Sequence, residues 1–137
     1  MVQPLIHDPI RLAGKAVPAT RADLPVLQDL VDTLIAHKDT CVGMAANMIG
    51  VSVAIIAFYD GDRIFTMLNP KIVKQSDPYE TEESCLSLLG GPRKTVRCQK
   101  IKVEYQTEQF QTRLKTFEGF TAQIIQHEID HLMGILI

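Results

Sequence analysis

The sequence predicts an α+β fold in which mostly antiparallel strands surround a central helix at the C-terminal end. Segments rich in β-forming residues lie in the middle of the chain, and two pairs of them are separated by short polar turns. Apolar residues recur at helical spacing near the start and again at the end. The length of 137 residues suits one domain, and 46% hydrophobic residues suit an ordinary globular core. We therefore expect a single domain over residues 1–137.

The first quarter of the chain is expected to be an irregular, extended lead-in, because four prolines interrupt it. These are Pro4, Pro9, Pro18 and Pro25. A helix is predicted over residues 23–38, where leucine, valine and isoleucine recur at steps of three and four. Asp23 stands where it could cap the start of this helix, and the apolar stripe predicts one buried face.

Runs of β-branched and aromatic residues predict four strands, over 51–58, 64–73, 101–105 and 110–117. The first two flank an Asp-Gly-Asp turn at residues 60–62, which is typical of a hairpin. The third alternates between apolar and polar residues, as a half-buried strand does. The short connections within the pair 51–58 and 64–73 and within the pair 101–105 and 110–117 favour antiparallel, hairpin-linked pairing.

A second helix is predicted over residues 121–133, and it is apolar on most sides. At 100° per residue, four of its side chains share one side: Ile124, His127, Glu128 and His131. Gln123, Gln126 and Asp130 form a narrow polar stripe, on which Asp130 is expected to be a solvated acid. Two histidines and a glutamate are unusual in a helix that should be buried on most sides.

Charge and composition exclude several classes of protein. Lys and Arg number 14 and Asp and Glu 16, for a net charge of −2, and the basic residues are scattered, which argues against a nucleic-acid partner. The longest apolar run, over 51–58, is too short to span a membrane, and the N-terminal residues do not resemble a secretory signal. Three cysteines without a short-spaced pair argue against a disulfide framework. We expect a soluble, cytoplasmic protein. Arg93 and Arg97 are expected to be solvated charges on a surface loop.

The strongest local signal is His127-Glu128-Ile129-Asp130-His131. Histidines at positions i and i+4 of a helix can bind one metal ion, and the glutamate between them can reach a water molecule at that ion. The competing interpretation is two histidines packed in a helix without a metal. A third ligand must come from elsewhere. The metzincin protease pattern matches as far as Gly134 but has Ile137 in place of its last histidine, which leaves a thiolate from Cys85 as the plausible donor.

Three segments of the chain together resemble the peptide deformylase family. Residues 126–134 contain the whole of the pattern Gln-His-Glu-x-Asp-His-Leu-x-Gly. Residues 83–87 match Glu-Gly-Cys-Leu-Ser with Ser84 in place of glycine. Residues 41–50 match Gly-x-Gly-Leu-Ala-Ala-x-Gln-x-Gly, with three replacements: Cys41 for glycine, Met44 for leucine and Met48 for glutamine.

This resemblance implies a hydrolase that removes the formyl group from the N-terminal methionine of nascent bacterial proteins. Cys85, His127 and His131 match the family's ligands for a divalent metal ion, natively Fe2+, and Zn2+ or Ni2+ could be found in purified protein. Glu128 matches the general base that later acts as an acid, and the backbone N–H of Leu86 matches a donor to the oxyanion. The implied partners are an N-formyl-methionyl peptide and, transiently, the ribosome.

The replacements bear on the substrate and on catalysis. Gly43 and Met44 match positions that line the family's substrate cleft, and Glu83 and Ser84 lie in a segment expected to run extended along the substrate backbone. Ile124 could form part of the methionine pocket or simply pack in the core. Met48 matches the position of the glutamine whose amide donates to the oxyanion, and a thioether has no such donor. The alternative to an active enzyme is therefore a weak or inactive paralogue that serves as a peptide- or metal-binding module.

Overall fold

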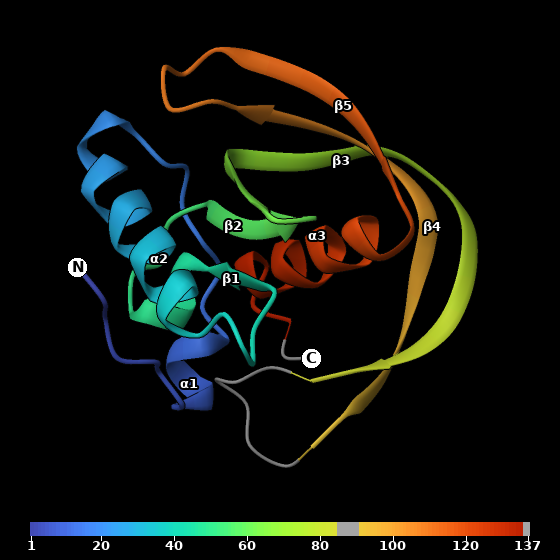
Figure 1. The fold of residues 1–137 in the computed structure, drawn as a ribbon, viewed down its shortest axis with the longest axis horizontal. Helices are drawn as coiled ribbons and strands as arrows, with labels where there is room; N and C mark the ends of the chain where they lie inside the picture. The colour runs from blue at the N-terminus through green and yellow to red at the C-terminus, as the bar shows by residue number, and fades with distance from the viewer. Residues whose placement is uncertain (85–90, 136–137) are drawn as a thin grey trace.

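The computed structural model describes residues 1–84 and 91–135 (Figure 1). Its elements in chain order are α1 (Pro9–Leu12), the 3-10 turn η1 (Arg21–Asp23), α2 (Leu24–Ala36), β1 (Gly43–Ala45), the 3-10 turn η2 (Ala46–Ile49), β2 (Ile55–Asp60), β3 (Arg63–Glu83), β4 (Arg93–Gln106), β5 (Thr112–Glu118) and α3 (Gly119–Leu132). The two long helices and four of the strands correspond to predicted segments, and the α+β class is confirmed.

The strands form one five-stranded sheet in the order β1-β2-β3-β4-β5, and every neighbouring pair is antiparallel. Figure 1 shows β3 and β4 as a long curved ribbon that bends around α3, while α2 lies on the other side of β1 and β2. The helix that carries the two histidines is therefore enclosed by the sheet, as the sequence predicts.

Strand β2 is buried on both faces, which explains its continuous apolar sequence. Ile56 and Phe58 belong to a core that includes the apolar side of α3, whereas Ile55 and Ala57 belong to a second core beneath α2. Because side chains alternate along a strand, β2 connects the two cores and sets the separation of the two helices. The C-terminal helix is thus held at a defined depth in the molecule.

Strands β3 and β4 are much longer than the segments predicted at 64–73 and 101–105. Their outer halves are polar and mostly exposed, so neither periodicity nor β-propensity marks them as strands. Opposite charges stand directly across this part of the ribbon at Glu82 and Lys94, and the carboxylate of Glu83 pairs across it with Arg97. These cross-strand pairs and the backbone ladder stabilise a hairpin that has little apolar sequence.

Shorter elements also differ from prediction. The short strand β1 falls in a segment for which no strand was predicted, and β2 begins at Ile55 rather than at residue 51. Phe110 has a φ of 61° and lies in a turn, so the last strand begins at Thr112. Three-residue strands and left-handed turn residues leave little signal in a single sequence.

The N-terminal quarter contains one turn of helix, α1, where we predicted an extended lead-in. Pro9 occupies its first turn, and the carboxylate of Asp8 accepts a hydrogen bond from the backbone N–H of Ile10. Asp23 makes no side-chain hydrogen bond to the first turn of α2, because its carboxylate instead accepts from the N–H of Thr20. Proline and an acidic cap are both compatible with a helix start, so the prolines alone were a poor guide.

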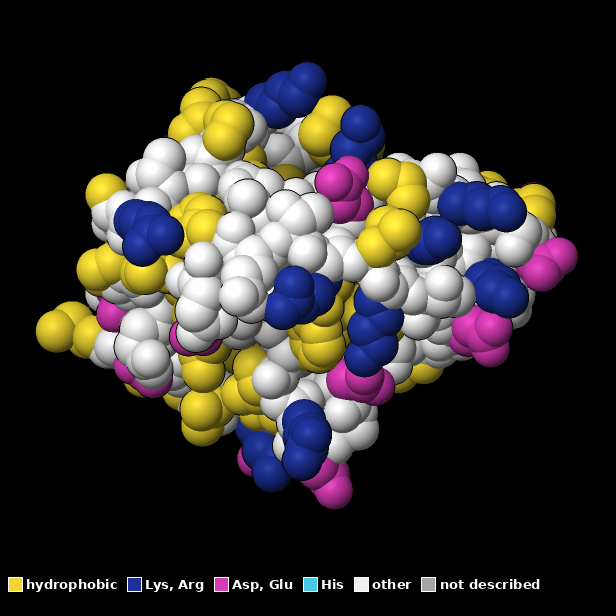
Figure 2. All heavy atoms as spheres, turned by 90° about the horizontal axis from the view of Figure 1, so that it is seen from above, with side chains coloured by type: hydrophobic (Ala, Val, Ile, Leu, Met, Phe, Trp, Pro, Cys, Tyr) yellow, Lys and Arg dark blue, Asp and Glu magenta, His cyan; other side chains and the backbone are white. Residues whose placement is uncertain are grey.

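Within the described residues, no helix is long and apolar enough to cross a membrane. On the face drawn in Figure 2, Lys and Arg side chains are interspersed with Asp and Glu and do not form a continuous basic stripe. This face therefore lacks the concentrated positive charge typical of a nucleic-acid interface.

Gly134 ends α3 in a left-handed conformation, with φ of 79°. The N–H of Gly134 donates to the carbonyl of His131 and that of Ile135 to the carbonyl of Asp130, the pairing of a Schellman cap. A Cβ at Gly134 would lie 2.3 Å from the carbonyl oxygen of Ala13. The residue must therefore be glycine both for its backbone conformation and for close packing against the end of α1.

We predict that Gly134→Ala lowers the free energy of unfolding more than Gly61→Ala does. Gly61 has φ of 65° but open space around it, so alanine there should cost only the left-handed strain of about 1–2 kcal/mol. Gly134→Ala adds a backbone clash, for a further loss of about 1–3 kcal/mol. Urea unfolding of both variants measures the difference, and equal losses would contradict the packing role of Gly134.

Candidate active site

Two histidines and a glutamate of α3 form a buried cluster. Each of His127, Glu128 and His131 offers a ligand atom, and these atoms lie within 4.8 Å of one another. The two imidazole rings are 4.4 Å apart between centroids. The i, i+4 spacing on one helix thus brings two nitrogen donors to one point, as the sequence predicts.

A buried carboxylate orients His127. Its Nδ1 lies 2.7 Å from Oε1 of Glu83, the last residue of β3. Burial raises the pKa of Glu83, but hydrogen bonds from His127, Arg97 and Gln123 lower it to about 2, so the group is ionised and can only accept. His127 therefore carries its proton on Nδ1 and presents Nε2 to a ligand, an arrangement typical of metal-binding histidines.

Arg97 is buried and bound to Glu83, not a solvated charge on a surface loop as predicted. It lies in β4 with 4% of its surface exposed. Its Nε lies 3.1 and 3.0 Å from the two carboxylate oxygens of Glu83, and its Nη2 lies 2.7 Å from Oε1. Burial opposes the charge on Arg97, but the hydrogen bonds to Glu83 and Asp130 outweigh it and raise its pKa. The guanidinium thus stays charged beside the cluster.

Asp130 is likewise paired, not the solvated acid that we predicted. Its carboxylate accepts a hydrogen bond from Nη1 of Arg97. The polar stripe of α3 also includes Gln126, whose side-chain amide donates to the carbonyl of Cys98 and accepts from its N–H, both at 2.8 Å. The stripe therefore faces β4 rather than water. Sequence spacing finds the stripe but not its partner, because the partner strand is distant in the chain.

Glu128 is 4% exposed and sits beside His131. Its Oε1 lies 3.3 Å from Nδ1 of His131 without the geometry of a hydrogen bond. Among the described residues this buried oxygen has no hydrogen-bond partner, which is rare and typical of a site completed by a ligand or water. A carboxylate so placed could exchange a proton with a bound molecule.

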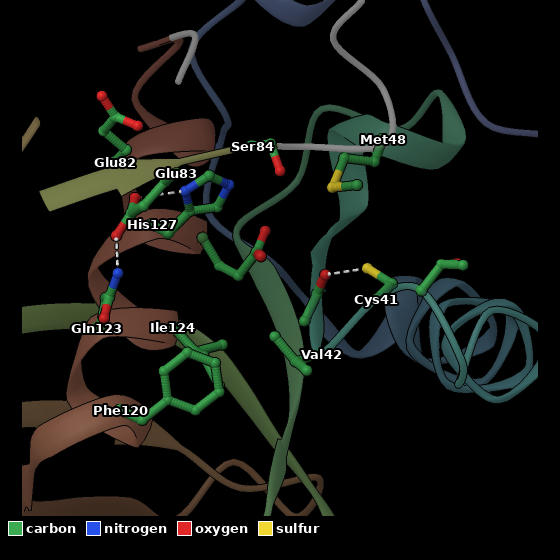
Figure 3. Close-up of a pocket in the computed structure, with 13 residues that line it drawn as sticks. Cys41, Val42, Met48, Glu82, Glu83, Ser84, Phe120, Gln123, Ile124 and His127 are labelled. Atoms are coloured by element: carbon green, nitrogen blue, oxygen red, sulfur yellow. Dashed lines mark hydrogen bonds and ion pairs between the residues drawn. The ribbon is translucent and has the colours of Figure 1, made fainter. Parts of the chain in front are cut away.

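The cluster opens into a cavity of about 340 Å³ (Figure 3). One wall comes from the segment around β1 and from η2, the opposite wall from the end of β3, and the third from α3. The lining residues are Thr40, Cys41, Val42, Gly43, Met48, Glu82, Glu83, Ser84, Phe120, Gln123, Ile124, His127 and Glu128. The cavity thus combines apolar side chains with the buried acid and histidine, as ligand sites do.

Gly43 allows β1 to approach α3 closely. A Cβ at Gly43 would lie 2.8 Å from Cγ2 of Ile124 and 3.0 Å from Oε2 of Glu128. The next residue, Met44, is fully buried in the core beneath α2 and does not line the cavity. Alternation along β1 therefore separates two neighbours that the family resemblance placed together in the cleft.

Met48 and Asn47 connect η2 to this site. Met48 is 1% exposed, and its Sδ lies 3.5 Å from the backbone N of Ala45. The side-chain amide of Asn47 donates to the carbonyl of His131 at 2.9 Å and to that of Leu12 at 3.3 Å. The turn is thereby tied to the end of the helix that carries the histidines.

Two predicted site residues, Cys85 and Leu86, lie outside the described residues. Ser84, their immediate neighbour in sequence, lines the cavity. Two residues near the site were not predicted from the sequence: Gln123, which lines the cavity, and Tyr79, whose hydroxyl donates to Oε1 of Gln123 at 3.3 Å. Gln123 lies one helical turn before His127, and that spacing was the available signal.

Comparison with known proteins identifies relatives over the whole chain. The sequence model of the polypeptide deformylase family matches residues 5–137. A peptide deformylase of Clostridium beijerinckii is 51% identical over 137 residues, covering 100% of both chains. Peptide deformylase 3 of Shewanella oneidensis is 35% identical over 130 residues, covering 90% of this chain and 78% of the relative.

Solved structures share the fold at lower identity. The crystal structure of peptide deformylase from Thermotoga maritima superposes with a TM-score of 0.89 at 27% identity, covering 99% of this chain and 95% of that chain. The Met-Ala-Ser-bound enzyme of Acinetobacter baumannii has a TM-score of 0.88 at 29% identity, with coverage of 99% and 96%. The resemblance predicted from three motifs is confirmed, and the chain belongs to the peptide deformylase family.

Proposed function

We propose that this protein is a metal-dependent hydrolase that removes the N-formyl group from the N-terminal methionine of nascent peptides. The observation that carries the proposal is the buried cluster of His127, Glu128 and His131, which opens into a cavity in a chain of this family. Identity of 51% along the whole length to a relative named peptide deformylase favours this function over an inactive binding module.

The proposed metal ligands are Cys85, His127 and His131. The hydrogen bond from Nδ1 of His127 to Glu83 fits a histidine that binds metal through Nε2, and Ser84 brings the chain to the cavity wall just before Cys85. One thiolate and two imidazoles accept Fe2+, which we propose for the cell, or Zn2+ or Ni2+ in purified protein. When bound, such an ion supplies Lewis-acid activation of water and of the formyl carbonyl.

Glu128 is the proposed general base and acid. Its carboxylate is buried beside His131 and reaches the cavity, so it can take the proton of an attacking water molecule and later deliver it to the leaving amine. The backbone N–H of Leu86 is the proposed donor to the oxyanion. Met48 lines the same cavity, and its thioether side chain has no N–H to donate.

The proposed substrate contacts follow the cavity walls. Ile124 and Phe120 offer apolar surface to the methionine side chain, while Gly43 and Ser84, on opposite walls, are placed to meet the peptide backbone. Glu83 lines this cavity, but its carboxylate is turned to His127 and Arg97. For a substrate that is a nascent chain, we propose a cytoplasmic location, transient contact with the ribosome and a single catalytic domain over residues 1–137.

We predict that Glu128→Ala lowers kcat for formyl-Met-Ala by about 10²–10⁴-fold, because proton transfer is lost. Formate release is measured on protein loaded anaerobically with Fe2+, or with Ni2+, and a chelator should abolish it in the parent. Glu108→Ala, an exposed acid of the turn after β4, is the matched control and should keep full activity. Turnover at background in the fully loaded parent would overturn the proposed function.

We predict that Met48→Gln raises kcat by about 10-fold or more, because the new amide N–H adds a donor to an oxyanion site where one donor accounts for about 10²–10³-fold. Met48→Leu has no such donor and should leave kcat near that of the parent. If Met48→Gln and Met48→Leu have the same kcat in steady-state assays, the oxyanion is stabilised without a donor from residue 48.

We predict that Gly43→Ala lowers kcat by about 10-fold or more while the protein stays folded. The new methyl group must displace Ile124 or Glu128, and displacement of a catalytic group by less than 1 Å is enough for such a loss. The measurement is kcat together with the urea midpoint. A normal kcat would show that β1 can move away from α3 without disturbing Glu128.

A further inference from the structure

Gln123 stands out among the residues around the cavity, because it places an amide between the apolar Phe120 and Ile124 and the histidine cluster on the wall formed by α3. Its amide is not directed at the cavity. Nε2 donates to Oε2 of Glu83 at 2.9 Å, and Oε1 accepts from the hydroxyl of Tyr79 at 3.3 Å (Figure 3 shows the first contact). Both polar groups of the Gln123 amide are therefore hydrogen-bonded beside His127, a candidate metal ligand. This indicates a role for Gln123 beyond lining the cavity.

The contacts of Glu83 indicate that role. Oε1 accepts from His127, while Oε2 accepts from Gln123, and both donors come from α3, one turn apart. Arg97 holds the carboxylate from β4 through a planar fork. A carboxylate bound only by one guanidinium group can still rotate relative to that group. Additional donors from a second element, here α3, fix the plane of the carboxylate. Gln123 is thus the second contact from α3 that determines how Glu83 meets His127.

Tyr79 completes the arrangement from β3. It lies four residues before Glu83 on the same strand and directly opposite Arg97 in the register with β4, so it shares their face. Burial and the charge of Glu83 raise the pKa of Tyr79, so the hydroxyl keeps the proton that it donates. With Oε1 of Gln123 directed to Tyr79, Nε2 must point to Glu83.

We propose that Gln123 and Tyr79 are positioning residues for the metal centre: they hold the Glu83 carboxylate in the orientation that fixes the ring of His127. This inference rests on the proposed function, because His127 is a ligand only if the site binds metal. Partners of a ligating histidine typically account for about 10–100-fold in metal affinity. Gln123 acts one contact further out, and we expect an effect near the lower end.

The test is Co2+ binding by the full chain. Titration measures the affinity for Co2+, and visible absorption spectra report the geometry of the bound ion. Gln123→Met keeps the length of the side chain but removes both polar groups, and it should weaken Co2+ binding by about tenfold and shift the absorption bands. Tyr79→Phe should change both in the same direction by a smaller factor. The matched control is Gln126→Met on the same helix, which loses hydrogen bonds to Cys98 and none to Glu83. It should lower the Tm while Co2+ affinity stays at the parent's value.

A second readout does not need metal. In apo protein the Nδ1 proton of His127, bonded to Glu83, should give a slowly exchanging NMR signal, and exchange should be faster in Gln123→Met. Parent-like Co2+ affinity and exchange in Gln123→Met, or equal weakening in Gln126→Met, would overturn the proposal. If the parent binds no Co2+ at all, the proposed function fails, and the exchange measurement alone decides the role of Gln123. Should Gln123→Met not fold, Tyr79→Phe decides by the same criteria.

Discussion

The buried carboxylate of Glu83 is the interaction on which the site depends. Taking a charge out of water is costly unless hydrogen bonds and an opposite charge compensate it. Here the compensation comes from two different elements. Arg97 on β4 supplies the opposite charge, and Gln123 and His127 on α3 donate hydrogen bonds. None of these donors lies near Glu83 in sequence. The carboxylate is therefore tolerated only when the β3–β4 ribbon is closed around α3, and that closure is also what builds the cavity wall.

Helix α3 has no solvated face beyond its first turn, and this follows from the same closure. From Thr121 to Leu132 none of its residues is exposed. Its apolar side packs on the sheet, its polar stripe of Gln123, Gln126 and Asp130 packs on β3 and β4, and Glu128 with His127 faces the cavity. Each face has a distinct partner, so rotation of the helix would break all three sets of contacts. A rigid scaffold of this kind keeps catalytic geometry within narrow limits.

Sequence reasoning succeeded where the signal was local. The 3.6-residue period located both long helices, the i, i+4 spacing grouped His127 with His131, and three ordered motifs identified the family. It failed where the partner was distant in the chain. Arg97 and Asp130 look like surface charges in a single sequence, and the outer halves of β3 and β4 are too polar to be recognised as strands. These errors have one origin, since Arg97 is buried and paired with Asp130 only because the polar ribbon forms.

The departures from the family motifs lie mainly on one side of the cavity. Cys41 and Met48 belong to the segments around β1 and η2, whereas the α3 motif is complete. Gly43 is retained where any Cβ would press on Ile124 and Glu128, and Asn47 ties η2 to the carbonyl of His131. The replaced positions can therefore alter the contacts offered to a bound substrate, while the retained ones keep β1 and η2 in register with α3. We accordingly expect differences in kcat between this protein and its relatives to arise from the wall formed by β1 and η2, while the histidine cluster stays the same.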